Sequence, residues 1–378
     1  MGAQIACRNM QAPKIARAFA LKYGRPGKPT LVGTALRLVA KSAGFANGTA
    51  GHSFEIDDYS YGAFTHPGCV VVAPALAIGE ERGAGGAQVL CAVAVGFEAA
   101  TRIALATQPS LLLDRGFHET SVHGSFASAL ACCALEQLDA TTTAHALAVA
   151  GSHACGTVEY ARSGGEVKRV HAGIGVVDGI RSTRLAQMGL SGPPTIFEGK
   201  RGFLQAFCNT HDARYSMPTS ARAGAFQSMR PSRCPRPWAV CMPRSPRTTT
   251  SWRSIPSQRS TSSPSCWASI RWRPCTAARS AIADRVRIEP GDESVRQFPK
   301  DSIARVTVQL KSGASFSATG YSLGTLKNSL GRSGIEAKFL DLVRPELGDE
   351  VARNIAVMVM ALEGLDDIRQ LFALLAAE

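Results

Sequence analysis

Apolar residues dominate several segments in the first half of the chain, and their spacing predicts helices. The longest run, AQVLCAVAVGFEAATRIALAT at residues 87–107, is interrupted by Glu98 and Arg102, which stand four positions apart and are expected to pair on an exposed stripe. Asp139 and Thr141 form a start signal for the helix predicted at residues 142–154. Small residues dominate the faces of these segments, so we expect close helix packing. The further helices are predicted at residues 125–137, 142–154 and 172–190.

The pattern changes near residue 280. Alternating apolar and polar positions with β-branched residues predict strands at 284–290 and within 303–320, the latter forming two strands joined by a Ser-Gly turn. Two amphipathic helices are predicted from 348 to 378, separated near Gly364. The implied fold is mainly α, with a large all-helical domain plus a smaller α/β (α+β) domain. The predicted organisation is a helical domain at 1–212, an anomalous segment at 213–280, a remnant of the small domain at 281–330 and C-terminal helices at 331–378.

Charge is distributed unevenly along the chain. The formal net charge is +13, but residues 216–280 contain eleven arginines and no lysine, aspartate or glutamate. The same window holds all four tryptophans. Without it the protein is nearly neutral, so the composition does not predict a folded basic face for nucleic acid. We therefore expect neither a nucleic-acid partner nor a membrane partner.

Cellular location and cysteine chemistry are inferred from the remaining composition. The N-terminus lacks the apolar core and cleavage site of a secretory signal, and VVVAPALAI at 70–78 is the longest candidate for a membrane span but is too short. A cytoplasmic location is expected. The cysteines are then expected to be reduced, with Cys132 and Cys133 in the core of an apolar helix.

Three polar clusters interrupt otherwise apolar segments. Histidine titrates near neutral pH and carboxylates hold it in one tautomer, so these mixtures suit general acid/base chemistry. A loop histidine beside glycine is also compatible with an ordinary turn, and His52, Asp57 and His66 match no closed zinc pattern. The clusters are His52, Glu55, Asp57, Asp58 and His66; His118 and His123; and Lys168 and His171.

Four motifs resemble the MmgE/PrpD family, which includes 2-methylcitrate dehydratase, cis-aconitate decarboxylase and iminodisuccinate epimerase. The motifs are FANGTAGHSFEIDDYSYGAFTHPG, GFHETSVHGSFASALA, GGEVKRVHAG and GPPTIFEGKRGFLQAF. The resemblance covers about residues 12–210 and resumes at about 281–378. It implies a helical domain with a smaller α/β domain, a homodimer, small di- or tricarboxylate substrates, and no metal or other cofactor.

The resemblance also implies site residues. Glu55 stands where the family has the first Asp of its DxDD run, and the other site residues match motif positions. Members act at a carbon next to a carboxylate, so one group moves a proton while cations stabilise charge. The predicted catalytic residues are His118, Asp58, Asp57, His66 and Lys168, with His118 and Asp58 as the proton-handling pair. The predicted substrate-binding residues are Glu55, His171 and Lys168.

The function implied is a cofactor-independent lyase that dehydrates 2-methylcitrate or a similar hydroxy-tricarboxylate. The alternatives are a decarboxylase or epimerase of a related acid, or a catalytically inactive family member.

The arginine-rich segment raises a separate hypothesis. The family has there a Lys-Pro-Tyr/Phe-Pro run followed by a histidine, whereas residues 216–280 contain no lysine, histidine or tyrosine. Reading GC-rich DNA out of frame yields Arg, Pro, Ser, Thr, Trp and Cys. We therefore predict compensating frameshifts near 214 and 280, and the chain is also expected to begin later than its relatives.

Overall fold

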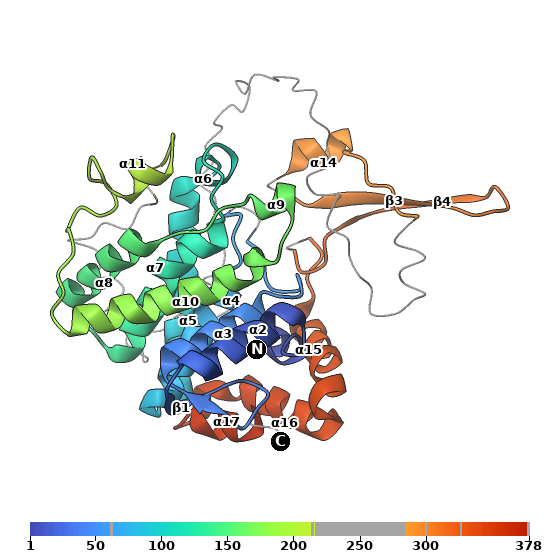
Figure 1. The fold of residues 1–378 in the computed structure, drawn as a ribbon. Helices are drawn as coiled ribbons and strands as arrows, with labels where there is room; N and C mark the ends of the chain where they lie inside the picture. Colours follow the sequence, from blue (N-terminus) through green and yellow to red (C-terminus); the bar gives the residue numbers. More distant parts are fainter. Residues whose placement is uncertain (61–62, 213–214, 216–284, 299–300, 326, 376–378) are drawn as a thin grey trace. The chain divides into compact units, whose positions relative to one another are not determined.

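The computed structural model describes residues 1–60, 63–212, 215, 285–298, 301–325 and 327–375. Most of these residues are helical (Figure 1). The first helices are α1 (Gly2–Ala6), α2 (Gln11–Tyr23), α3 (Ala40–Gly51), α4 (Pro67–Arg82), α5 (Gly86–Thr107) and α6 (Ser110–Leu113). They are followed by α7 (Glu119–Glu136), α8 (Ala140–His153), α9 (Tyr160–Ser163), α10 (Val167–Gln187) and α11 (Phe203–Phe207).

The described strands form two antiparallel pairs, one early and one late in the chain. The short antiparallel strands β1 (Pro26–Thr30) and β2 (Arg37–Leu38) lie between α2 and α3. After the arginine-rich segment come α14 (Asp292–Gln297), β3 (Ile303–Gln309), β4 (Ser315–Tyr321), α15 (Gly331–Leu347), α16 (Asp349–Met360), a 3-10 turn (Leu362–Gly364) and α17 (Arg369–Leu375). The mainly α character predicted from the sequence is confirmed. The predicted domain boundaries near 213 and 280, like the proposed frameshifts, lie outside the described residues.

Several predicted elements are confirmed. Helix α5 covers the apolar run, and Arg102 Nε donates to Glu98 Oε1 at 2.5 Å. Asp139 caps α8 by accepting from the Thr142 amide at 2.8 Å. Cys132 and Cys133 are buried, as predicted. Strands β3 and β4 pair in continuous antiparallel register from Ile303–Tyr321 to Gln309–Ser315, and the break near Gly364 separates the last helices.

Other predictions were wrong. Residues 285–290 form no strand. Helices α7 and α10 begin at Glu119 and Val167, about five residues before the predicted starts, because their first turns carry polar residues that break the apolar period. The prediction that no segment is long and apolar enough to span a membrane was also wrong, since α5 meets both criteria. This is weak support for a membrane span, because 56% of its most apolar window is buried inside the protein and core helices pass the same test.

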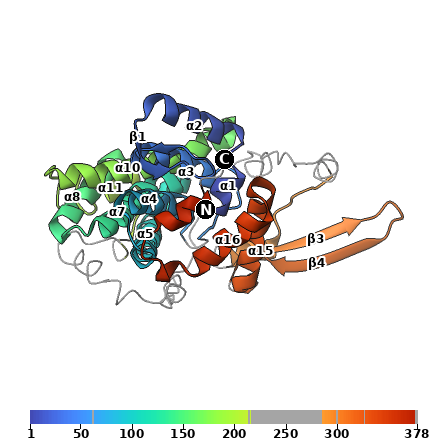
Figure 2. The ribbon, with the colours of Figure 1, turned by 90° about the horizontal axis from the view of Figure 1, so that it is seen from below.

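The described residues fall into two compact units. In the helical unit, the C-terminal helices α15 to α17 join the core made by the first half of the chain (Figure 2). Ile5 and Ala73 belong to the same buried cluster as Val343, Ile355 and Phe372. In the other unit, β3 and β4 form a ribbon with one apolar face, where Val308 pairs with Phe316. A two-stranded ribbon is marginally stable by itself, so it adds little to the core.

Glycines set the approach of α7 to α10. A Cβ on Gly175 would lie 3.3 Å from the Gly124 backbone carbon, and one on Gly179 would lie 2.3 Å from Ser128 Cβ. The contacting positions advance in the same direction along both helices, so α7 and α10 run parallel. Their N-terminal ends therefore meet at one place, and this is where the predicted site residues lie.

Candidate active site

Three helices begin at the candidate site. His66 is the N-cap of α4, His118 is the N-cap of α7, and Lys168 and His171 lie in the first two turns of α10. The His66 amide donates to Thr120 Oγ1 at 3.2 Å, which ties the start of α4 to the start of α7. Helix N-termini carry partial positive charge, so their convergence favours an anionic ligand.

Asp57 is held between two histidines. His52 Nδ1 lies 2.7 Å from Asp57 Oδ2, and His66 Nδ1 lies 3.5 Å from the same oxygen. The Asp57 side chain is 5% exposed. Burial would raise the pKa of Asp57, but the hydrogen bond from His52 and the charges of the two histidines outweigh it and lower the pKa to about 2. Asp57 is therefore an ionised carboxylate that orients both rings.

Asp58 occupies a different position from Asp57. Its carboxylate oxygens accept from the Gly68 amide at 2.9 and 3.1 Å, so it caps the first turn of α4. Its carbonyl oxygen lies 2.8 Å from His66 Nδ1 and fixes that ring from the other side. Since this nitrogen donates to a carbonyl, Nε2 of neutral His66 carries the lone pair. The structure thus joins Asp58 to His66. The expectation that Asp58 and His118 handle the proton together stays a prediction.

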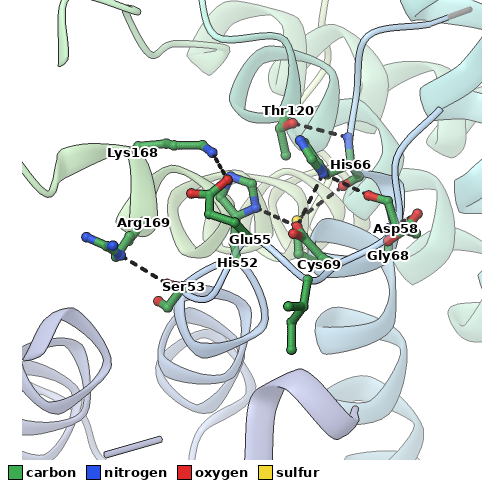
Figure 3. A network of polar contacts seen from close by, with 12 residues as sticks. His52, Ser53, Glu55, Asp58, His66, Gly68, Cys69, Thr120, Lys168 and Arg169 are labelled. Carbon is green, nitrogen blue, oxygen red and sulfur yellow. Dashed lines mark hydrogen bonds and ion pairs between the residues drawn. The ribbon is translucent and has the colours of Figure 1, made fainter. Parts of the chain in front are cut away.

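Lys168 and Glu55 form an ion pair across the site (Figure 3). Glu55 has φ of 58°, a left-handed conformation that is unfavourable for a residue with a side chain and is common at functional sites. The Lys168 side chain is 19% exposed and that of Glu55 is 30% exposed. The cation is therefore reachable from solvent, as is His66, whose side chain is 20% exposed, whereas Asp57 and His52 are buried.

His118 and His171 form the buried side of the site. Their Nδ1 atoms lie 2.9 Å apart, and the two rings are 3% and 4% exposed. Tyr160 packs edge-on against both rings, and His52 stacks on His118 at 5.7 Å. Burial, followed by the neighbouring charges of His52 and others, lowers the pKa of His118 well below its usual value. Burial also lowers the pKa of His171 to about 4. Both imidazoles are neutral near pH 7.

The segment before α9 supports this pair through Gly156. The Gly156 carbonyl accepts from the His118 amide at 3.0 Å. Gly156 has φ of 114°, and a Cβ there would lie 2.7 Å from Ser121 Cβ and 3.5 Å from His171 Cε1.

We expect Gly156→Ala to lower the free energy of unfolding by about 1–3 kcal/mol and to displace the His118 ring, because both the backbone and the side chains must shift. Urea unfolding of the purified variant measures the loss. Gly189→Ala is the matched control, because Gly189 has φ of 95° but nothing within 4 Å of the added Cβ. Equal losses in the two variants would show that the contact with Ser121 has no role.

His123, which the sequence groups with His118, lies outside the site. It is fully buried, and its Nε2 lies 2.9 Å from Thr107 Oγ1 on α5. The Thr107 hydroxyl lies within donating distance of the Ile103 and Ala104 carbonyls, so His123 Nε2–H is the donor. Burial lowers the pKa of His123 to about 3.

The His123 contact predicts a loss of stability in acid. A folded pKa near 3 lies below the unfolded value of 6.5, so stability is complete above pH 6.5 and falls as the unfolded chain takes up a proton. We expect His123 alone to cost about 2 kcal/mol between pH 7.5 and 5. Urea unfolding at both pH values tests this against His123→Gln, which keeps a donor and cannot titrate there. An equal pH dependence in both proteins would contradict the assignment.

Sequence reasoning missed several residues of the site. Tyr160 and Thr120 contact predicted residues. Arg169 lies next to Lys168, and its Nε donates to the Ser53 carbonyl at 3.1 Å (Figure 3). Tyr160 stands only six residues before Glu166, the N-cap of α10, and its aromatic ring was the available signal. His52 belonged to a predicted polar cluster, and the structure makes it the main partner of Asp57.

One group could in principle hold a metal ion. His52, Asp57 and Cys69 each place a potential ligand atom within 4.8 Å of the others. However, His52 already bonds Asp57, and the Cys69 thiol donates to the His66 carbonyl at 3.1 Å. Burial raises the pKa of Cys69 well above its usual value, which disfavours the thiolate that a metal needs. The absence of a metal stays a prediction.

Comparison with known proteins assigns the family. A sequence model of the MmgE/PrpD N-terminal domain matches residues 1–216, more than half of the chain. The chain belongs to the MmgE/PrpD family. The match ends where the arginine-rich composition begins.

Curated relatives of this MmgE/PrpD chain are cis-aconitate decarboxylases. The protein of Aspergillus terreus is 33% identical over 193 residues, which is 50% of this chain and 39% of that protein. The Mus musculus protein is 32% identical over 191 residues, covering 50% of this chain and 37% of its own length. The Homo sapiens protein is 32% identical over 178 residues, covering 46% and 36%. The match thus spans about two fifths of the length of these relatives.

Proposed function

We propose that this chain is a lyase that removes CO2 from a small unsaturated tricarboxylate of the cis-aconitate class. The observation that carries the proposal is the joining of Lys168, three helix N-termini and two buried neutral histidines in one cluster. The relatives support decarboxylation more than the dehydration that we expected from the sequence. Dehydration of 2-methylcitrate stays a prediction.

Lys168 and the helix N-termini are suited to binding carboxylates. Lys168 is a partly exposed cation whose partner Glu55 sits on a strained backbone position. A substrate carboxylate would replace or share that ion pair, with the partial positive charge of the helix ends adding to the attraction. His66, with Nδ1 fixed by the Asp58 carbonyl and Asp57, is a second contact on the α4 side.

The chemistry requires one proton. When the bond between carbon and the leaving carboxylate breaks, its electron pair forms a new carbon–carbon double bond. The original double bond shifts its electrons to the neighbouring carbon, which takes a proton. A trianion and one proton thus give a dianion and CO2. We assign the proton to His118, a buried imidazole that is neutral near pH 7, while Lys168 stabilises the developing negative charge.

A panel of acids tests the proposal. The protein is mixed separately with cis-aconitate, 2-methylcitrate and iminodisuccinate, and products are followed by proton NMR and CO2 release. Binding of tricarballylate, a saturated tricarboxylate that cannot react in this way, is measured by calorimetry. We expect cis-aconitate to be decarboxylated and tricarballylate to bind more weakly to Lys168→Met. A chain that neither binds nor converts any of these acids would overturn the proposal.

A further inference from the structure

The contact between His118 and His171 joins two Nδ1 atoms at 2.9 Å. A hydrogen bond of this kind contains one proton, which only one of the rings carries. The other ring accepts through Nδ1 and, being neutral, carries its own proton on Nε2. The two rings must therefore hold opposite tautomers. A change at one ring changes the other.

We propose that His171 is a positioning residue and proton carrier for His118, and that the shared Nδ1–Nδ1 proton decides whether Nε2 of His118 acts as acid or base. This rests on the proposed function, because His118 is assigned there as the proton donor. The sequence led us to expect that His171 binds substrate. The geometry directs its Nδ1 at the ring of His118, the residue assigned above as the proton donor, and substrate binding by His171 stays a prediction.

The surroundings keep the pair neutral. Burial lowers the pKa of both rings, and the positive charges of His52 and Lys168 lower it further. His52 stacks on His118, His66 adds charge when protonated, and Tyr160 packs against both rings. The pair therefore shares a single mobile proton near neutral pH and does not hold a stable imidazolium.

The transfer balances with water as the proton source. His118 gives its Nε2 proton to the substrate carbon and takes the shared proton at Nδ1. His171 loses that proton at Nδ1 and gains at Nε2 the one solvent proton that the reaction consumes, so both rings end neutral with exchanged tautomers. Before the next substrate binds, His118 gains a solvent proton at Nε2, the shared proton returns to Nδ1 of His171, and His171 releases its Nε2 proton to solvent. No oxidant or further reactant is needed.

Nitrogen NMR of histidine-labelled protein tests the tautomers without relying on activity. The chain has eight histidines, so His118 and His171 are assigned from single variants. We expect one ring to show Nδ1–H and the other Nε2–H at pH 7, or intermediate shifts on both if the proton moves quickly. His171→Phe should return His118 to a single tautomer. Two Nε2–H rings in the wild type, with His118 unaffected by His171→Phe, would overturn the proposal.

Kinetics separate proton transfer from simple support. His171→Gln can bond Nδ1 of His118 but cannot pass a proton, so we expect kcat to fall at least about tenfold with little change in KM. His171→Phe should lose at least as much. His145→Gln on α8, where His145 Nδ1 accepts from the Gly192 amide, is the matched control and should keep wild-type kcat. Wild-type kcat in His171→Gln would overturn the relay, whereas failure of every acid to bind would count against the proposed function alone.

Discussion

Replacing His118 with glutamine is expected to lower kcat by about 10²- to 10⁴-fold, the range for loss of a general acid. Glutamine fills a similar volume and can bond Nδ1 of His171, but it cannot donate and regain a proton at neutral pH. The backbone of residue 118 would remain fixed, because its amide bonds the Gly156 carbonyl in any variant. KM should change little, since we assign substrate binding to Lys168 and the helix N-termini. Steady-state decarboxylation of cis-aconitate measures both constants.

A second variant on the same helix controls for folding. His123→Gln changes another buried histidine of α7, but its contact is with Thr107 on α5. We expect His123→Gln to keep most of the wild-type kcat even if its stability falls. If His118→Gln retained more than about a third of the wild-type kcat, His118 would not be the proton donor. Equal losses in both variants would point to damaged packing in α7.

The sequence predicted the helices well along most of their length, but it misplaced the starts of α7 and α10, which begin at the site. Helix α5 and the Glu98–Arg102 pair follow from a clear apolar period. The first turns of α7 and α10 do not follow from an apolar period, because Glu119 and Lys168 interrupt it where these helices enter the site. Residues where a helix enters a functional site serve chemistry as well as packing, so hydrophobic patterns predict helix starts poorly there.

The candidate site was predictable as a set of residues but not as a set of contacts. The seven residues predicted as catalytic or substrate-binding lie in or beside the cluster, whereas His123 does not, since spaced polar motifs in apolar surroundings mark most such positions. The partners could not be read from the sequence. Asp57 and Asp58 are neighbours in the chain, yet one bonds His52 and the other caps α4 at Gly68. That division depends on how the loop after α3 turns, which no sequence period encodes.

Correcting the reading frame across the arginine-rich segment is expected to raise turnover by at least about 10²-fold, because that segment should supply further site residues. The gene is first sequenced across codons 205–290 and translated in every frame. We expect one frame to restore a Lys-Pro-Tyr-Pro-like run followed by a histidine. The restored chain and the chain as written are then expressed and their turnover of cis-aconitate is compared. The His118→Gln variant of each chain gives its background rate.

The two outcomes would identify different kinds of protein. If the restored chain is active and the present one is not, the eleven arginines between residues 216 and 280 are a translation of the wrong frame, and the geometry around His118 belongs to a working lyase. If the DNA confirms the sequence and no frame contains the run, the frameshift hypothesis fails. The cluster of Lys168, His118 and His171 would then have to act without those residues. Binding of tricarballylate with no turnover would identify the chain as an inactive family member that still recognises carboxylates.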